Sequence, residues 1–228
     1  MKTSNGNNHV LDYENCKKIY NLFFKRVIDW ILAIFLLIVL SPVYFVISIV
    51  IIVETGFPVF YCAERGGYKN KKFKIIKFRT MIKNADKIGG GTTALNDKRI
   101  TKIGNFLRKT KLDEIPQLIN IIKGEMSFVG PRPELLTYTD QYTHEERHIL
   151  DVRPGITDYS SIEFISLDEI VGDKNADETY EKYVLKRKNS LRLKYAAEIS
   201  FKTDTKLFFT TIFATISKMV KVVFKVGN

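Results

Sequence analysis

The sequence predicts an α+β fold, mainly α: a membrane re-entrant helix hairpin, then a small cytoplasmic α/β domain with interfacial amphipathic helices. Three observations predict it, namely an apolar run broken by a proline, start and stop signals around short helices, and a basic amphipathic C-terminal stretch. We expect four segments: a polar tail at 1–20, a re-entrant helix at 21–55, a cytoplasmic domain at 56–204 and a basic interfacial helix at 205–228.

The apolar run from Trp30 to Val53 holds 24 residues without a formal charge. About 20 such residues cross a bilayer core as one helix. Ser41-Pro42 interrupts the run, and proline removes a backbone donor, so the helix must kink or reverse there. Both flanks are basic, and the positive-inside rule assigns basic flanks to the cytoplasmic side. A hairpin that enters and leaves by one leaflet satisfies both flanks, which a single crossing does not.

The net charge of +11 and the pI near 9.5 indicate an anionic partner. Nucleic acid, anionic lipid and a phosphorylated substrate all fit this charge, but the adjacent apolar run favours lipid. No recognisable nucleic-acid-binding motif occurs, so we expect no nucleic-acid partner. Cys16 and Cys62 lack metal-ligand spacing and are expected to be free thiols in a reducing compartment. The apolar run begins too late and is too long for a cleavable signal peptide.

Short elements follow the apolar run. Val59–Tyr61 and Phe73–Met81 are predicted strands separated by a turn at Gly66-Gly67. Asp113 and Glu114 precede Pro116, and Gly124 closes the apolar pattern, which indicates a helix between them. Further helices are predicted at Ile103–Leu112, Glu145–Leu150 and Ala176–Ala197.

The C-terminal stretch from Leu207 to Val226 places Lys218, Lys221 and Lys225 among apolar residues at helical spacing. This pattern is typical of a helix lying in a membrane interface. Packing of the same helix against the core of the domain is an equal alternative.

The centre of the chain carries the candidate functional residues. Asp113 before a helix is commonly an N-cap, and Glu114 commonly complements the helix dipole. Adjacent carboxylates at a helix N-terminus also suit an ionised nucleophile and a divalent metal such as Mg²⁺. Arginines on proline-stiffened loops such as that of Arg132 bind phosphate at low entropic cost. These residues, with the apolar run, indicate phosphoryl chemistry on a lipid.

The ordered set of motifs resembles the monotopic phosphoglycosyl transferases, a family of bacterial sugar transferases. The resemblance covers about residues 20–157, with a looser match through Tyr195 and Asp204. The matching residues are Lys25-Arg26-x-x-Asp29, Ser41-Pro42, Lys77-Phe78-Arg79-Thr80-Met81, Asp97-x-Arg99-x-Thr101-x-x-Gly104-x-x-Leu107-Arg108, Leu112-Asp113-Glu114-x-Pro116-Gln117-Leu118, Asn120, Gly124, Ser127-Phe128-Val129-Gly130-Pro131-Arg132-Pro133 and Arg153-Pro154-Gly155-Ile156-Thr157.

The resemblance implies that 56–204 is a catalytic domain that transfers a sugar-1-phosphate from a nucleotide sugar, usually a UDP-sugar, to polyprenol phosphate. Asp113 would form the phosphosugar intermediate and hold Mg²⁺, and Glu114 would assist proton handling. The reaction would initiate surface glycan synthesis on the cytoplasmic face of the bacterial inner membrane. Because about 20 residues precede the matching unit, we expect the minimal catalytic form. The phosphate-binding candidates are Lys77, Arg79, Arg99, Arg108, Arg132 and Arg153.

The sequence departs from the family pattern at 158–165, where many members carry an Asn-Gly-Arg triplet and this chain has Ile165 at the position of the arginine. We expect the remaining arginines to supply the phosphate contacts, with Asp158 and Glu163 facing sugar hydroxyls or an amino group. The alternative is a surface loop without substrate contact.

A non-catalytic, membrane-attached adaptor that binds anionic lipid or an acidic partner is the competing function. The adjacent pair Asp113-Glu114 favours the enzyme, because an adaptor does not need it. The sequence leaves open the sugar, the glycan pathway and the oligomeric state, a homo-oligomer included.

Overall fold

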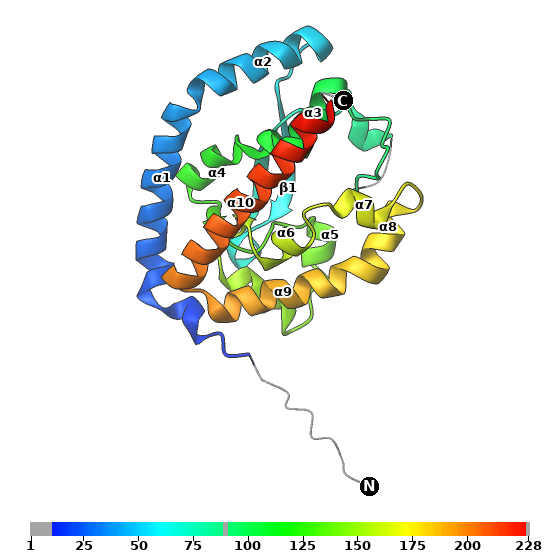
Figure 1. The fold of residues 1–228 in the computed structure, drawn as a ribbon. Helices are drawn as coiled ribbons and strands as arrows, with labels where there is room; N and C mark the ends of the chain where they lie inside the picture. The colour runs from blue at the N-terminus through cyan, green and yellow to red at the C-terminus, as the bar shows by residue number, and fades with distance from the viewer. Residues whose placement is uncertain (1–10, 89–90, 227–228) are drawn as a thin grey trace.

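The computed structural model of the chain describes residues 11–88 and 91–226, and the side chains of Asp86 and 221–226 are outside that description. Helices surround two small sheets, so the predicted mainly helical α+β class is confirmed (Figure 1). The first half of the predicted polar tail, residues 1–10, lies outside the described residues, as do the side chains of Lys221 and Lys225.

The apolar run forms two helices, α1 (Lys25–Val39) and α2 (Ser41–Thr55), which follow a π-helical turn, η2 (Tyr20–Phe24). No single helix in the described part of the chain is long and apolar enough to cross a bilayer. The two together have that length and composition, with a bend of 61° between them. Pro42 lies in the first turn of α2, where its missing N–H costs no hydrogen bond. The predicted break at Ser41-Pro42 is confirmed.

The first sheet is the antiparallel hairpin of β1 (Phe60–Gly66) and β2 (Lys72–Phe78), with Phe60 opposite Phe78. Its two strands were predicted in order, but β1 continues to Gly66 and β2 ends before Met81. The second sheet pairs β3 (Ser127–Val129) with β4 (Gly155–Thr157) in parallel and was not predicted.

Two glycines bring the loops that follow β3 and precede β4 into contact. A Cβ on Gly155 would lie 2.2 Å from the backbone nitrogen of Gly130, and one on Gly130 would lie 2.2 Å from the carbonyl oxygen of Arg153. Side chains at these positions would force the strands apart. The glycines therefore fix where the neighbouring Arg132 stands.

The remaining chain is helical. The helix predicted at 103–112 is α3, the one predicted at 176–197 is α8, a π-helical turn and α9 in succession, and the one predicted at 145–150 is a 3-10 turn. The bounds are α3 (Lys102–Thr110), η5 (Leu112–Glu114), α4 (Gln117–Lys123), α5 (Leu136–Thr139), η6 (Glu146–Asp151), α6 (Tyr159–Glu163), α7 (Leu167–Val171), α8 (Ala176–Thr179), η7 (Tyr180–Val184), α9 (Leu185–Glu198) and α10 (Phe201–Val226). Smaller 3-10 turns are η1 (Glu14–Lys17), η3 (Tyr68–Asn70) and η4 (Ala85–Lys87).

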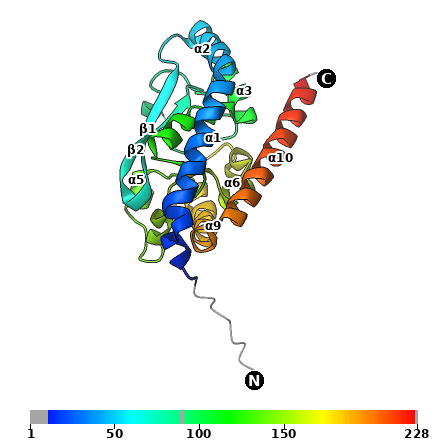
Figure 2. The ribbon, with the colours of Figure 1, turned by 90° about the vertical axis from the view of Figure 1, so that its left-hand side faces the viewer.

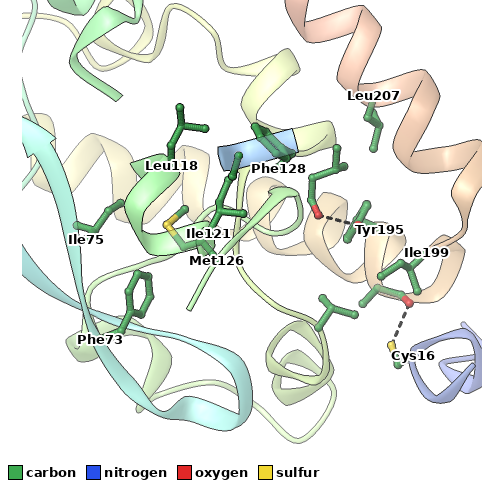
Figure 3. Close-up of a cluster of buried hydrophobic side chains, with 14 residues drawn as sticks. Cys16, Phe73, Ile75, Leu118, Ile121, Met126, Phe128, Tyr195, Ile199 and Leu207 are labelled. Atoms are coloured by element: carbon green, nitrogen blue, oxygen red, sulfur yellow. Dashed lines mark hydrogen bonds between the residues drawn. The ribbon is translucent and has the colours of Figure 1, made fainter. Parts of the chain in front are cut away.

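The main core gathers side chains from α1, β2, α4, β3, α9 and α10 (Figure 3). Within it the Tyr195 hydroxyl donates to the carbonyl of Val129 over 3.0 Å, and Cys16 Sγ donates to the carbonyl of Ala196 over 3.1 Å. The turn η1, which precedes the bent pair, is thereby packed on α9.

A buried ionic group joins the start of α1 to α10. Asp204 Oδ2 lies 2.5 Å from Lys25 Nζ and accepts a hydrogen bond of 2.7 Å from the Tyr20 hydroxyl. Its other oxygen accepts one of 2.7 Å from Tyr195. The charges of an otherwise apolar helix are therefore neutralised where it meets the domain.

The helix α10 begins at Phe201, before the predicted boundary at 205. Leu207 is buried in the core and Phe208 packs edge-on against Phe128, whereas Phe209 and Phe213 are exposed. Figure 2 shows α10 on the far side of the molecule from the hairpin of β1 and β2. One face of α10 therefore packs on the core, as one alternative expected. The opposite face is apolar and exposed, as the interfacial alternative requires.

Candidate active site

Asp113 and Glu114 lie in η5, a 3-10 turn between α3 and α4, instead of in the first turn of α4 as predicted. Lys111 adopts φ +61°, which ends α3 and turns the chain into η5. The N-cap of α4 is Pro116, and no side chain caps that helix. The N-cap interpretation of Asp113 is therefore wrong.

Glu114 is fixed between two cations. Its Oε1 lies 3.1 Å from Lys77 Nζ, and Arg132 donates to both carboxylate oxygens, with 3.0 Å between Nη1 and Oε2. Burial raises the pKa of Glu114, but the charges of Arg132 and Lys77 outweigh it and hold that pKa well below the ordinary value. Glu114 is therefore an ionised, oriented carboxylate.

Asp113 has the opposite surroundings. It is 6% exposed, and its Oδ1 is buried without a hydrogen-bond partner among the described residues. Burial, followed by the charge of Glu114, raises its pKa above the ordinary value, and Lys77 and Lys111 offset part of this. Buried polar atoms without partners are rare in folded proteins and need an explanation. An oxygen left open for a substrate or a cation is such an explanation.

The guanidinium of Arg108 donates hydrogen bonds to hydroxyl groups. Its Nη2 donates to Thr93 Oγ1 over 2.6 Å and its Nη1 to Thr80 Oγ1 over 3.5 Å. Because a hydroxyl does not neutralise a guanidinium, Arg108 retains a positive charge that suits an anion.

Arg99 and Arg79 are engaged by the protein. Arg99 Nη2 lies 2.6 Å from Asp97 Oδ2 and its Nε 2.9 Å from Oδ1 of the same residue. Arg79 Nη2 donates to the carbonyl of Gly56 over 2.6 Å and to Thr55, which ties β2 to the end of α2. Its Nε and Nη1 are buried and have no partner among the described residues.

Arg153 is placed elsewhere. Its guanidinium lies over the Tyr68 ring, 5.2 Å from the centroid, and it is absent from the walls of the cavity described below. The structure therefore does not bring Arg153 together with the other predicted arginines. The backbones beside Arg153 and Arg132 touch, since Gly155 N donates to the carbonyl of Pro131 over 3.0 Å, but the two side chains have different partners, Tyr68 and Glu114.

A large cavity of about 2390 Å³ collects the other predicted residues. Its wall includes Lys77, Arg79, Arg99, Arg108, Asp113, Glu114 and Arg132. Among its described lining residues eleven are Lys or Arg and five are Asp or Glu, so an anionic ligand is favoured. Sites for one small molecule measure roughly 300–1,000 Å³. The cavity therefore has room for more than one substrate.

Comparison with known proteins gives the context for this geometry. The family model described as bacterial sugar transferase matches residues 20–218. The chain belongs to this family.

Curated relatives of the sugar transferase include proteins of named activity. It is 37% identical over 197 residues to a UDP-glucose:undecaprenyl-phosphate glucose-1-phosphate transferase of Escherichia coli, an alignment covering 85% of this chain and 40% of that protein. It is 37% identical over 145 residues to a UDP-N-acetylgalactosamine-undecaprenyl-phosphate N-acetylgalactosaminephosphotransferase of Aeromonas hydrophila, covering 61% and 34%. A putative undecaprenyl-phosphate N-acetylgalactosaminyl 1-phosphate transferase of Bacillus subtilis is 43% identical over 124 residues, covering 54% and 69%. The chain thus spans well under half the length of the first two relatives.

The departure at 158–165 has a structural explanation in this sugar transferase. Asp158 is buried and caps α6, accepting from the backbone nitrogen of Ser161 over 2.7 Å. Glu163 pairs on the surface with Arg187 over 2.8 Å. Neither acid lines the cavity, so the expectation that they face the sugar is wrong. The stretch is nevertheless more than a surface loop, because Ser160 and Ile165 line the cavity.

The site fits a cation that is held by Asp113 together with the phosphates of a substrate, and not one that is held by several protein side chains. The described residues hold no group of three or more His, Cys, Asp or Glu side chains that could hold a metal. The unpartnered oxygen of Asp113 is a suitable ligand for Mg²⁺, which commonly takes one or two carboxylates together with substrate phosphates and water.

Sequence reasoning missed several residues of the cavity wall, namely Lys111, Glu134, Tyr180 and Lys188. Glu134 directly follows Arg132-Pro133, and this position beside a candidate site residue could have identified it from the sequence. Lys188 had none, because it lies among many lysines on one helix and burial alone distinguishes it.

Proposed function

We propose that this chain is a phosphoglycosyl transferase that moves a sugar-1-phosphate from a UDP-sugar to polyprenol phosphate. One observation carries the proposal: a buried aspartate with an unpartnered oxygen stands beside a glutamate held by two cations, in a cavity rich in basic residues. The printed names of the Escherichia coli and Aeromonas hydrophila relatives support the substrate classes.

The reaction proceeds by two displacements at one phosphorus atom. An oxygen of Asp113 attacks the sugar-linked phosphorus of the donor, the bond to the bridging oxygen breaks, and UMP leaves with that electron pair. An oxygen of polyprenol phosphate then attacks the phosphosugar-enzyme, releasing the Asp113 carboxylate and giving polyprenol-diphospho-sugar. The acceptor phosphate attacks as its dianion, because Arg132 and Lys77 hold the pKa of Glu114 too low for this carboxylate to take a proton from it.

The basic residues hold the substrates for these steps. Arg108 and Lys111 lie along the cavity wall near Asp113, and their charges reach its carboxylate. Arg132 and Lys77 fix Glu114. Mg²⁺ would be held by Asp113, and when bound it neutralises the charge of the donor diphosphate.

The bent pair of α1 and α2 is the membrane element in this proposal, and it is re-entrant. The turn η1 before the pair packs on α9, where Asn15 and Cys16 donate to the carbonyls of Ala197 and Ala196. The hairpin of β1 and β2 after the pair belongs to the same body (Figure 1). These contacts support both flanks lying on one side of the membrane, the cytoplasmic face of the bacterial inner membrane.

The outer faces of the pair and of α10 suit lipid. Exposed apolar side chains there include Trp30, Ile31, Phe35, Phe45, Val46, Val53, Phe209, Phe213 and Ile216. Such a surface is larger than soluble proteins expose without a partner. The cavity also has an apolar wall between α1 and α10, formed by Leu36, Leu40, Phe208 and Ile212, which suits the polyprenol chain.

The test is release of UMP from a panel of UDP-sugars by the purified chain in the presence of Mg²⁺ and polyprenol phosphate. We expect one or a few UDP-sugars to be turned over. A UDP-sugar alone should leave a phosphosugar adduct on Asp113, seen by intact mass. A non-catalytic adaptor would bind vesicles but release no UMP and form no adduct, and that result would overturn the proposal.

A further inference from the structure

A second cluster of charged and polar side chains adjoins the same cavity: Glu134, Tyr180 and Lys188 line it, and Arg192 is fully buried behind them. Glu134 follows Arg132-Pro133, Tyr180 lies in η7, and Lys188 and Arg192 come from α9. Arg192 Nη2 donates to Glu134 Oε1 over 2.6 Å, and the Tyr180 hydroxyl donates to the same oxygen. The direct hydrogen bonds to Glu134 Oε1 therefore come from Arg192 and Tyr180, and Lys188 contributes its charge from a longer distance.

The ammonium group of Lys188 is buried but incompletely paired. Lys188 is 5% exposed, and its Nζ lies 3.8 Å from Glu134 Oε1, beyond hydrogen-bond distance. Within the described structure it makes one hydrogen bond, of 3.3 Å, to the Tyr180 hydroxyl. An ammonium group has three donors, and a buried cation without full pairing costs stability. Burial, followed by the charge of Arg192, lowers the pKa of Lys188 to about 7.

The position of Lys188 connects it to the acidic pair. Lys188 lines the cavity, and the charge of Arg132, which holds Glu114, lies close enough to lower its pKa further. Two cations that repel each other across a cavity are both stabilised by an anion between them. The lining residues of the neighbouring segment 160–167 are all uncharged. Lys218 of α10 also lines this side of the cavity, but its Nζ donates to the carbonyl of Ile165 and to Ser166 over 3.0 and 3.1 Å, whereas Lys188 has one hydrogen bond.

We propose that Lys188 binds the diphosphate of the nucleotide-sugar donor, an inference that rests on the proposed function. The donor fits better than the lipid acceptor because α9 packs against α6 and η7, whereas the apolar wall comes from α1 and α10. The water-soluble nucleotide sugar would thus bind on the polar side of the cavity, which α6, η7 and α9 form. The free energy lost by burying the cation is recovered when the phosphate binds.

Lys188→Met keeps the length of the side chain and removes its charge, and Lys188→Arg restores a cation. Lys186→Met on the exposed face of the same helix is the matched control. We expect Lys188→Met to raise KM for the preferred UDP-sugar about tenfold to a hundredfold, the range for one hydrogen bond to a charged group. KM for polyprenol phosphate should stay within about twofold, and Lys188→Arg should recover part of the loss.

Thermal stability separates this role from a structural one. Lys188→Met gives up the contacts of the ammonium with Glu134 at 3.8 Å and with the Tyr180 ring at 5.0 Å, but it also removes the cost of burying an incompletely paired cation. Because Arg192 keeps its direct pair with Glu134, the Tm of the variant should equal or exceed that of the wild type. The stabilisation of the wild type by UDP alone should be reduced in Lys188→Met and unchanged in Lys186→Met.

An unchanged donor KM, a rise confined to the KM of polyprenol phosphate, or a lowered Tm in Lys188→Met would each overturn the inference. Failure of the proposed function is distinguishable. A wild-type chain whose Tm rises with UDP through Lys188 but that transfers no sugar would refute the transferase and leave the binding role intact.

Discussion

At the scale of single residues, the two carboxylates of η5 are adjacent in sequence but have opposite surroundings. Glu114 is oriented by Lys77 and Arg132, whereas one oxygen of Asp113 is buried without a partner in the described structure. Both carboxylates line the cavity, but both oxygens of Glu114 are already bonded to Arg132, so Asp113 is the carboxylate with an oxygen left to act as nucleophile.

Asp113→Asn should lower kcat by orders of magnitude, because the amide keeps the size of the side chain but is not a nucleophile. It should leave Tm unchanged or higher, since Oδ1 makes no hydrogen bond to lose and a buried charge is removed. UMP release and calorimetry check the two parts. Near-normal turnover by the variant would assign the nucleophile elsewhere.

Arg132→Ala should weaken turnover of every UDP-sugar alike, because Arg132 orients Glu114 and touches no group that differs between sugars. Arg132→Lys should recover only part of the activity, since an ammonium cannot contact both carboxylate oxygens in the planar geometry of a guanidinium. A changed ranking of UDP-sugars in either variant would show instead that Arg132 selects the sugar.

Glu134→Gln should lower stability in a pH-dependent way. Burial raises the pKa of Glu134, but Arg192 and Lys188 outweigh it and lower that pKa from 4.5 to about 2. A carboxyl whose pKa is lower in the folded state stabilises the fold above its unfolded pKa and loses that contribution as pH falls towards 2. The difference in Tm between wild type and variant should be largest near pH 7 and shrink between pH 4.5 and 2. The shift corresponds to about 3 kcal/mol at most. A difference independent of pH would contradict this assignment.

At the scale of elements, the bent pair is joined to the acidic turn. The Tyr44 hydroxyl on α2 donates to the carbonyl of Ile115 over 2.7 Å, one residue after Glu114. Glu54 at the end of α2 accepts from the backbone nitrogen of Lys102, in the first turn of α3, over 2.9 Å. The helices that would enter the membrane therefore also position η5.

Topology is tested by labelling single cysteines introduced at Lys18 and Lys72 in a Cys62→Ser background. Both positions are exposed, unlike Asn21, which is buried and unsuitable for labelling. A re-entrant pair places both on the cytoplasmic side. Pro42→Ala should shift the pair towards spanning, because it restores a backbone donor at the break. Labels on opposite sides in the wild type would leave a single crossing.

At the scale of the whole molecule, charge and apolar surface act together. The chain has a net charge of +11, and its exposed apolar side chains concentrate on α1, α2 and α10. Charge attracts the protein to anionic lipid, but charge is screened by salt whereas apolar burial is not.

High salt or alkaline carbonate should therefore leave the chain in the membrane pellet, and detergent should release it. A variant with Phe209 and Phe213 replaced by Ser should still pellet through α1 and α2, because the exposed face of α10 supplies only part of the apolar surface. Release by salt alone would show that binding is electrostatic and would contradict an embedded helix pair.

The sequence by itself determined the longer helices, the break and the acidic pair, but not the short helices α5, α6 and α7. Pro42 breaks the apolar run because its missing backbone donor affects only the turn around it. Gly124 ends α4 because its φ of +78° is a property of that single residue. The motifs from Lys77 to Arg132 identified seven residues that share one cavity.

Only the tertiary structure decided which charges serve the site. The parallel pair of β3 and β4 joins segments that are more than twenty residues apart, which no local pattern predicts. Around this pair Arg132 binds Glu114 and Arg153 lies over Tyr68, although both arginines stand beside a proline in the sequence. In the sequence Lys188 does not differ from the other lysines of the chain. In the structure it is buried and lies in the cavity wall. Burial and pairing of a charge depend on which distant segments surround it, and they decide its free energy and hence its role.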